Sequence, residues 1–152
     1  MDLSIVVVNW NVCDLLRRCL SSLVESDQYQ LAYEIIVVDC ASYDGSVEMV
    51  RREFPEVRLI VSEENLGYVR GNNLGIAEAN GRHLLILNPD TEIVGDALAT
   101  MVDYLDEHTR VGVLGPGLRY PDGTLQPSRR RFPTLATAFC ESTLLHQWFP
   151  NN

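Results

Sequence analysis

The chain has 152 residues, 46% of them hydrophobic and 22% charged, which is ordinary for one soluble globular domain with a single core. Its formal net charge of −9 argues against nucleic acid as a partner, because non-specific binding depends on neutralising phosphates. The four cysteines contain no Cys-x-x-Cys pair, which disfavours a metal cluster, and no apolar run approaches the roughly 18 residues that span a bilayer. We therefore expect a cytoplasmic protein without a signal peptide; attachment to the cytoplasmic face of a membrane stays open.

The first predicted strand is the β-branched run Leu3–Val8, which ends in the polar and aromatic cluster Asn9-Trp10-Asn11. A second buried strand, Glu34–Asp39, ends in a carboxylate. Between the two strands, apolar residues recur with the spacing of an amphipathic helix, at Val12, Leu15, Leu16, Cys19, Leu20 and Leu23.

Residues 40–46 form a predicted turn, and Asp44 or Ser46 is suitably placed to cap the following helix, which ends at Phe54. A short third strand is expected at Arg58–Val61.

The next segment, Asn65–Gly75, is polar and punctuated by glycines, so it is expected as a flexible loop that leads into a helix ending near Asn80. Further along, the spacing predicts a helix over Gly95–Glu107 and a strand over Val111–Leu114.

Four consecutive aliphatic residues, Leu84–Leu87, are typical of a fully buried strand inside a sheet covered on both faces. The strand stops abruptly, because Pro89 has no N–H to donate, and Asp90 and Glu92 follow just past its end. A carboxylate at this position is a natural ligand for a hard divalent cation such as Mg²⁺ or Mn²⁺. Taken alone, Asp90 suits a turn before the helix near Gly95 equally well.

The alternation of strands and helices predicts an α/β fold, with a mostly parallel open sheet and helices on both faces. The pattern then changes. Arg119–Leu125 carries the Asp-Gly signal of a β-hairpin, and a last helix is expected from Pro133 to about Phe149.

Polar residues follow three of the predicted strands: Asn9 and Asn11 follow the first, Asp39 ends the second, and Asn88 and Asp90 follow the fourth. Because parallel strands present their carboxyl ends at one edge of a sheet, where ligands of such sheets bind, we expect these residues to converge. No dinucleotide fingerprint follows the first strand and no P-loop motif occurs, which disfavours hydride transfer and P-loop phosphotransfer.

Four ordered blocks within residues 3–94 resemble those of the family 2 glycosyltransferases. The blocks are the strand and Asn-Trp-Asn of Val6–Asn11, the Val-Asp-Cys-Ala-Ser-Tyr-Asp-Gly-Ser of Val38–Ser46, the glycine-rich Asn65–Gly75, and Asn88-Pro89-Asp90 in place of the family's Asp-x-Asp metal motif. The form of the metal motif is similar to that of the rhamnosyltransferase-like branch. The resemblance implies the A-type glycosyltransferase fold of nucleotide-diphospho-sugar transferases, with residues 1–118 as the nucleotide-sugar-binding domain and 119–152 leading into an acceptor-binding half.

The resemblance also implies roles for single residues. Asp39 would accept a hydrogen bond from a uracil or thymine N–H, Arg70 would neutralise the diphosphate, and Asp90 would hold Mg²⁺ or Mn²⁺ as the catalytic metal ligand. The other implied donor-binding residues are Val8, Asn9, Asn11 and Asn88. The alternatives are structural: Asp39 capping the 40–46 turn, Asn9 and Asn11 forming turns, and Arg70 as a solvated surface cation.

The chain departs from the family pattern at several points. Position 88 is Asn, so the first carboxylate of the metal motif is missing, and Glu92 is a candidate replacement of unknown direction. Position 40 is Cys where the family usually has Asn. No match to the family's acceptor-half segments follows Arg119, and no general base is identified, because Glu141 is the only acidic residue after Asp122 and a poor substitute.

We therefore expect a truncated, nearly inactive donor-binding portion whose predicted last helix self-associates through an apolar face. The complete enzyme is expected to transfer a sugar, with inversion, from a uridine or thymidine diphosphate sugar to a hydroxyl of a glycan or lipid-linked acceptor in cell-surface polysaccharide synthesis. A nucleotidyltransferase would need a basic, glycine-rich loop after the first strand, and a receiver-like signalling domain would need an acidic pair there and a late lysine; the chain has none of these. A nucleotide-binding module without catalysis stays open.

Overall fold

The computed structural model describes residues 1–26 and 31–127. The chain divides into two compact units, Met1–Leu114 and Gly115–Asn152, which are described separately. The helix predicted at 133–149 lies outside the described residues. Within them, no helix is long and apolar enough to cross a bilayer.

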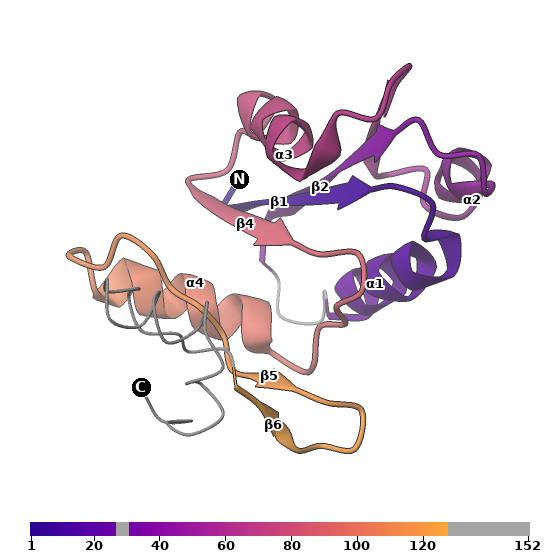
Figure 1. The fold of residues 1–152 in the computed structure, drawn as a ribbon. Helices are drawn as coiled ribbons and strands as arrows, with labels where there is room; N and C mark the ends of the chain where they lie inside the picture. The colour runs from indigo at the N-terminus through magenta and orange to yellow at the C-terminus, as the bar shows by residue number, and fades with distance from the viewer. Residues whose placement is uncertain (27–30, 128–152) are drawn as a thin grey trace, which may run out of the picture. The chain divides into compact units, whose positions relative to one another are not determined.

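The first unit contains a sheet of four parallel strands in the order β3-β2-β1-β4 (Figure 1). The strands alternate along the chain with helices, which confirms the predicted α/β fold. The strands are β1 (Leu3–Asn9), β2 (Tyr33–Cys40), β3 (Arg58–Ser62) and β4 (His83–Leu87), and the helices are α1 (Cys13–Glu25), α2 (Ser46–Glu53), α3 (Gly67–Ala77) and α4 (Ala97–Glu107).

Helices cover both faces of the sheet, as the sequence predicts. Because side chains alternate along a strand, Ile5 and Val7 of β1 face the layer that contains α1, α2 and α4, whereas Val6 faces α3. The predicted stripe of α1 is the one that reaches the core, with Leu16, Cys19, Leu20 and Leu23 buried. Figure 1 shows α3 on one side of the strands and α1 with α4 on the other.

Strand β4 is not fully buried, which corrects the prediction for Leu84–Leu87. Leu87 is 8% exposed, but Leu84 and Ile86 are 42% and 45% exposed. The reason is topological, because β4 is one of the two edge strands of the sheet. Its register sets Ile86 opposite Val6 on the α3 face, and α3 makes its main contacts with β1 and β2 instead.

Helix α3 begins at Gly67, so most of the glycine-rich segment expected as a loop is helical. Gly71 and Gly75 are buried on the face toward the sheet. A Cβ atom at Gly75 would lie 2.4 Å from Val6 Cγ1, and one at Gly71 would lie 2.8 Å from Val8 Cγ1. Glycine is therefore required here for close helix–sheet packing and does not signal a flexible loop.

Residues 111–114 form no strand, which also contradicts the prediction. Val113 is 91% exposed, and the segment pairs with neither edge strand of the four-stranded sheet. In the second unit the predicted hairpin is confirmed, because β5 (Leu118–Arg119) and β6 (Leu125–Gln126) pair antiparallel around a turn with Gly123 at φ 83°.

Candidate nucleotide-sugar site

Asn9 and Asp39 lie side by side at the carboxyl edge of the sheet, as the sequence predicts. They are register partners on β1 and β2, and their side chains are 0% and 1% exposed. Asn9 Nδ2 donates a hydrogen bond to Asp39 Oδ2 at 2.7 Å. A buried carboxylate needs such donors, because burial without them is costly.

Ser42 joins this pair and is the residue that sequence reasoning missed. Its hydroxyl oxygen accepts hydrogen bonds from Asn9 Nδ2 at 3.1 Å and from the Asn11 N–H at 3.0 Å, while its own N–H donates to Asp39 Oδ1 at 2.9 Å. Asp39 therefore does cap the turn after β2, the structural role expected as the alternative. The only sequence signal for Ser42 is its place in the Ser-Tyr-Asp-Gly-Ser segment.

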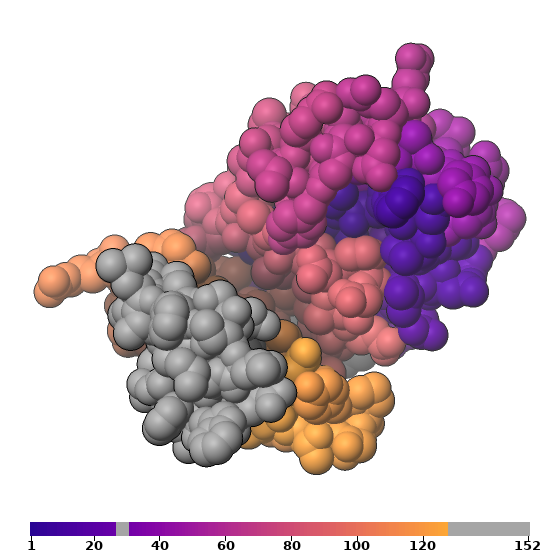
Figure 2. All heavy atoms as spheres, viewed as in Figure 1, coloured from indigo at the N-terminus to yellow at the C-terminus, as the bar shows by residue number. Residues whose placement is uncertain are grey.

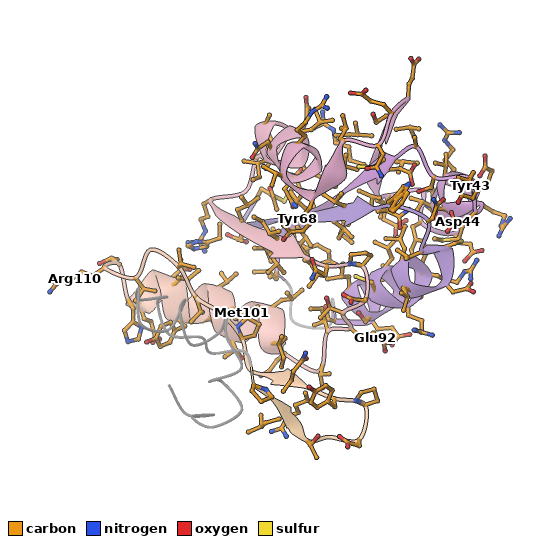
Figure 3. The ribbon with its side chains drawn as sticks, in the orientation of Figure 1. Tyr43, Asp44, Tyr68, Glu92, Met101 and Arg110 are labelled. Carbon is orange, nitrogen blue, oxygen red and sulfur yellow. The ribbon has the colours of Figure 1, made fainter. Side chains whose placement is uncertain are left out.

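The loops after β1 and β2 are tied together by further polar contacts. Asn11, in the left-handed region at φ 53°, accepts a hydrogen bond through Oδ1 from the Tyr43 N–H at 2.9 Å. Asp44 Oδ2 accepts from the Cys13 N–H at 2.8 Å, and Asp44 Oδ1 accepts from the N–H of Ser46, the first residue of α2, at 3.1 Å. Figure 3 shows Tyr43 and Asp44 together on this loop.

The hydrogen bonds also affect the Asp44 carboxyl group. Burial raises its pKa, but the Ser46 hydroxyl and the N–H groups of Cys13 and Ser46 outweigh that effect and hold the pKa below its ordinary value. The N-cap of α2 is Gly45, so neither of the two predicted cap residues occupies that position; Asp44, one residue earlier, accepts a hydrogen bond from the N–H of Ser46.

The edge also presents an acceptor without a partner. Asn9 Oδ1 is buried and forms no hydrogen bond with any described residue. Val8, which precedes it, is half-buried beneath α3. In Figure 2 the indigo atoms of the chain's first residues are visible between the magenta atoms of the α3 region and the salmon atoms that follow β4.

Asn88 and Asp90 follow β4 at the same edge, and both are exposed. The Asn88 carbonyl accepts hydrogen bonds from the Thr91 N–H at 3.2 Å and the Thr91 hydroxyl at 2.6 Å, which closes a tight turn. The Asp90 carboxylate forms no hydrogen bond or ion pair with the described part of the chain. The pKa of the Cys19 thiol is raised to about 12, mainly by burial and to a smaller extent by the nearby charges of Asp90 and Glu92.

Glu92 does not serve as a second carboxylate beside Asp90. Its side chain pairs with Arg18 of α1, with Oε1 at 3.2 Å from Nε, and Figure 3 shows Glu92 beside that helix. No group of three or more metal-ligating His, Cys, Asp or Glu side chains occurs among the described residues. The residues present are one free carboxylate and one amide, which suits a Mg²⁺ or Mn²⁺ ion that keeps water and takes its other ligands from substrate phosphates.

Arg70 lies on α3, one turn from its start, and not in a loop. Its guanidinium pairs with Glu64 at 2.7 Å, and the two side chains are 65% and 67% exposed. Ion pairs this exposed contribute little to stability, so an anionic ligand can compete for Arg70 at small cost.

The parallel α/β sheet places buried polar groups and a free carboxylate at its carboxyl edge, which is where open sheets of the doubly wound class bind ligands. The family model of glycosyl transferase family 2 matches residues 4–151, so the chain belongs to that family. The chain is 28% identical, over 99% of its length, to the N-acetylglucosaminyl-diphospho-decaprenol L-rhamnosyltransferase of Mycobacterium tuberculosis, of which it covers 52%. It is 26% identical, over 95% of its length, to the poly(ribitol-phosphate) beta-N-acetylglucosaminyltransferase TarS of Staphylococcus aureus, of which it covers 28%.

Solved structures agree with the family assignment. The TarS 1–349 structure in complex with UDP-GlcNAc superimposes with a TM-score of 0.64 at 28% identity, covering 72% of this chain and 32% of that one. The mannosyltransferase PcManGT of Pyrobaculum calidifontis, in complex with GDP-Man and Mn²⁺, gives a TM-score of 0.60 at 28% identity, covering 68% and 32%. The fold is therefore the A-type glycosyltransferase fold, and the chain spans about half the length of the mycobacterial relative.

Proposed function

We propose that the chain binds the donor of a metal-dependent, inverting glycosyltransferase. The donor is a uridine or thymidine diphosphate sugar, and the acceptor is a hydroxyl of a glycan or lipid-linked saccharide in cell-surface polysaccharide synthesis. The observation that carries the proposal is the carboxyl edge, where a buried Asn9–Asp39 pair stands at the central strands and a free Asp90 carboxylate follows β4.

The comparisons support this proposal at the level of class. The TarS structure named above holds UDP-GlcNAc, and the PcManGT structure holds a nucleotide sugar together with Mn²⁺. The name of the mycobacterial relative describes an acceptor linked to a lipid diphosphate. A lipid-linked acceptor also suits attachment to the cytoplasmic face of a membrane.

Each residue at the edge has a role in this proposal. Asp39 accepts from the N–H of a uracil or thymine ring, and Val8, Asn9 and Asn11 line the base pocket. Arg70 exchanges Glu64 for the diphosphate. Asp90, helped by Asn88, holds Mg²⁺ or Mn²⁺, which when bound neutralises charge on the diphosphate.

Transfer with inversion balances as a single displacement. The acceptor oxygen forms a bond to the anomeric carbon, the bond from that carbon to the diphosphate oxygen breaks, and its electron pair leaves with the nucleoside diphosphate. The acceptor proton passes to a general base, for which residues 1–26 and 31–127 offer no candidate that we assign. We accordingly expect this chain alone to bind donor and to transfer sugar poorly.

The proposal is tested by calorimetric titration of the chain with UDP and with dTDP, each with and without Mn²⁺. We expect binding of at least one nucleotide that Mn²⁺ strengthens. If the protein is folded in the calorimeter and binds neither UDP nor dTDP, the proposed donor site is contradicted. Binding that Mn²⁺ leaves unchanged would contradict the metal dependence only.

A further inference from the structure

The loop after β4 lies along helix α1 and is attached to it at three points. The Cys19 thiol donates to the Asn88 carbonyl at 3.8 Å, Arg18 pairs with Glu92 at 3.2 Å, and the Ile93 N–H donates to Ser22 Oγ at 2.9 Å. The three attachment points in the loop bracket Asp90. Helix α1 is therefore the support on which this loop rests.

The three attachments differ in strength. The Arg18 and Glu92 side chains are 59% and 58% exposed. An ion pair that is so exposed to water contributes little to stability. The Cys19 thiol is a weak donor at long range. The Ser22 hydroxyl is satisfied on both sides, because it donates to the Cys19 carbonyl at 2.7 Å while it accepts from the Ile93 N–H.

Asp90 depends on this support more than an ordinary side chain would. Its carboxylate has no hydrogen bond or ion pair with any described residue, so only the backbone of its loop fixes its position. The near side of the loop is held by the Asn88–Thr91 turn. The far side is held by the Ser22 hydrogen bond to Ile93.

We propose that Ser22 is a positioning residue for Asp90: it anchors the far side of the loop and so holds the carboxylate ready for the metal–diphosphate complex of the donor. The inference rests on the proposed function, because it assigns a support to the same site. Preorganised ligands bind a metal more tightly than ligands on a mobile loop, since less ordering is needed on binding.

Two serines on α1 provide a matched pair of variants. Ser22→Ala removes the anchor, whereas Ser21→Ala makes the same change one position earlier, at a side chain that forms no hydrogen bond with residues 88–93. Alanine favours a helix at both positions, so neither variant should unfold α1. Ser22→Thr keeps the hydroxyl and serves as the rescue variant.

Two measurements are made on each variant: amide hydrogen exchange of residues 88–95, and calorimetric titration with UDP in the presence and absence of Mn²⁺. Loss of one hydrogen bond of ordinary strength predicts, in Ser22→Ala, about fivefold faster exchange in the loop and about fivefold weaker Mn²⁺-dependent binding. Metal-free UDP binding should stay unchanged in Ser22→Ala. Ser21→Ala and Ser22→Thr should match the wild type in both measurements.

Each other outcome has a distinct meaning. Unchanged loop exchange in Ser22→Ala overturns the anchor, and faster exchange with unchanged Mn²⁺-dependent binding overturns its positioning role. A wild-type chain that binds UDP without any help from Mn²⁺ overturns the metal part of the proposed function and this inference with it, while the exchange data still decide whether the anchor exists.

Discussion

The buried Asn9–Asp39 pair shows how a few polar atoms organise the candidate site. Four hydrogen bonds join Asn9, Asp39, Ser42 and the Asn11 N–H, and they hold the loops after β1 and β2 as one unit. Because these groups are shielded from water, a missing partner costs more than an exposed hydrogen bond would.

Asp39→Ala is expected to destabilise the protein. The substitution leaves the Ser42 N–H unpaired and removes the shorter of the two hydrogen bonds that Asn9 Nδ2 donates, so we expect the free energy of unfolding to fall by about 1–3 kcal/mol. Urea denaturation monitored by tryptophan fluorescence measures the change. Asp14→Ala is the control, because the Asp14 side chain is 87% exposed, and a loss of equal size in that variant would contradict the account.

At the scale of elements, glycine determines how closely α3 approaches the sheet. Gly75→Ala would place Cβ 2.4 Å from Val6 Cγ1. Overpacking of this kind costs about 1–3 kcal/mol, and the better helix propensity of alanine returns at most about 1 kcal/mol. We therefore expect a net loss of stability in thermal unfolding. Gly112→Ala, the same change with nothing within 4 Å, should be nearly neutral, and equal effects would contradict the close-packing role.

Near the amino ends of the strands, Glu34 makes the stability of the protein depend on pH. The Ser4 hydroxyl donates to Glu34 at 2.6 Å and the Asn80 N–H donates to it at 2.7 Å, which joins β1, β2 and the turn before β4. The Ser4 hydrogen bond, first among the causes, lowers the pKa of Glu34. A lowered folded-state pKa means that this contribution is present above the ordinary glutamate pKa of about 4.3 and is lost as the pH falls through the folded-state value.

Glu34→Gln should therefore reduce the acid dependence of stability. We expect the difference in unfolding free energy between wild type and variant to shrink as the pH falls from neutrality to below about 4. Urea denaturation at a series of pH values measures it. A difference that stays constant over that range would show that Glu34 carries no such linkage.

The elements differ in how far the sequence predicts them, and the reasons are physical. Helix α1 and strands β1 and β2 are predicted from local sequence patterns. The helix has one apolar face, and each strand contains one continuous apolar run. Helix α3 is mistaken for a loop because its buried face consists of small residues that carry no hydrophobic signal. The exposure of Leu84 and Ile86 depends on strand order, which no local pattern encodes.

The same distinction holds within the site. The convergence of Asn9 and Asp39 follows from strand ends in a parallel sheet, and it is confirmed. The Arg18–Glu92 ion pair and the Ile93–Ser22 hydrogen bond join segments about 70 residues apart in sequence, so the residue types alone do not reveal them. The nucleotide and metal roles that the family resemblance implies stay predictions for all of Val8, Asn9, Asn11, Asp39, Arg70, Asn88 and Asp90.

For the whole molecule, self-association through residues 134–149 also stays a prediction, because that segment lies outside the described residues. If its helix has a free apolar face, the apparent mass in sedimentation should rise with protein concentration. Replacing Leu144 and Leu145 by Glu should then keep the chain monomeric. A wild-type chain that is monomeric at every concentration would contradict the prediction.

The account depends most directly on Asp90 as the metal ligand of a donor site. The decisive measurement is calorimetric titration with UDP and Mn²⁺ of the wild type, Asp90→Ala and Glu92→Gln. We predict that Mn²⁺-dependent binding is lost in Asp90→Ala and retained in Glu92→Gln, because Glu92 is directed to Arg18. Retained binding in Asp90→Ala, or its loss in Glu92→Gln alone, would contradict the account and place the metal elsewhere.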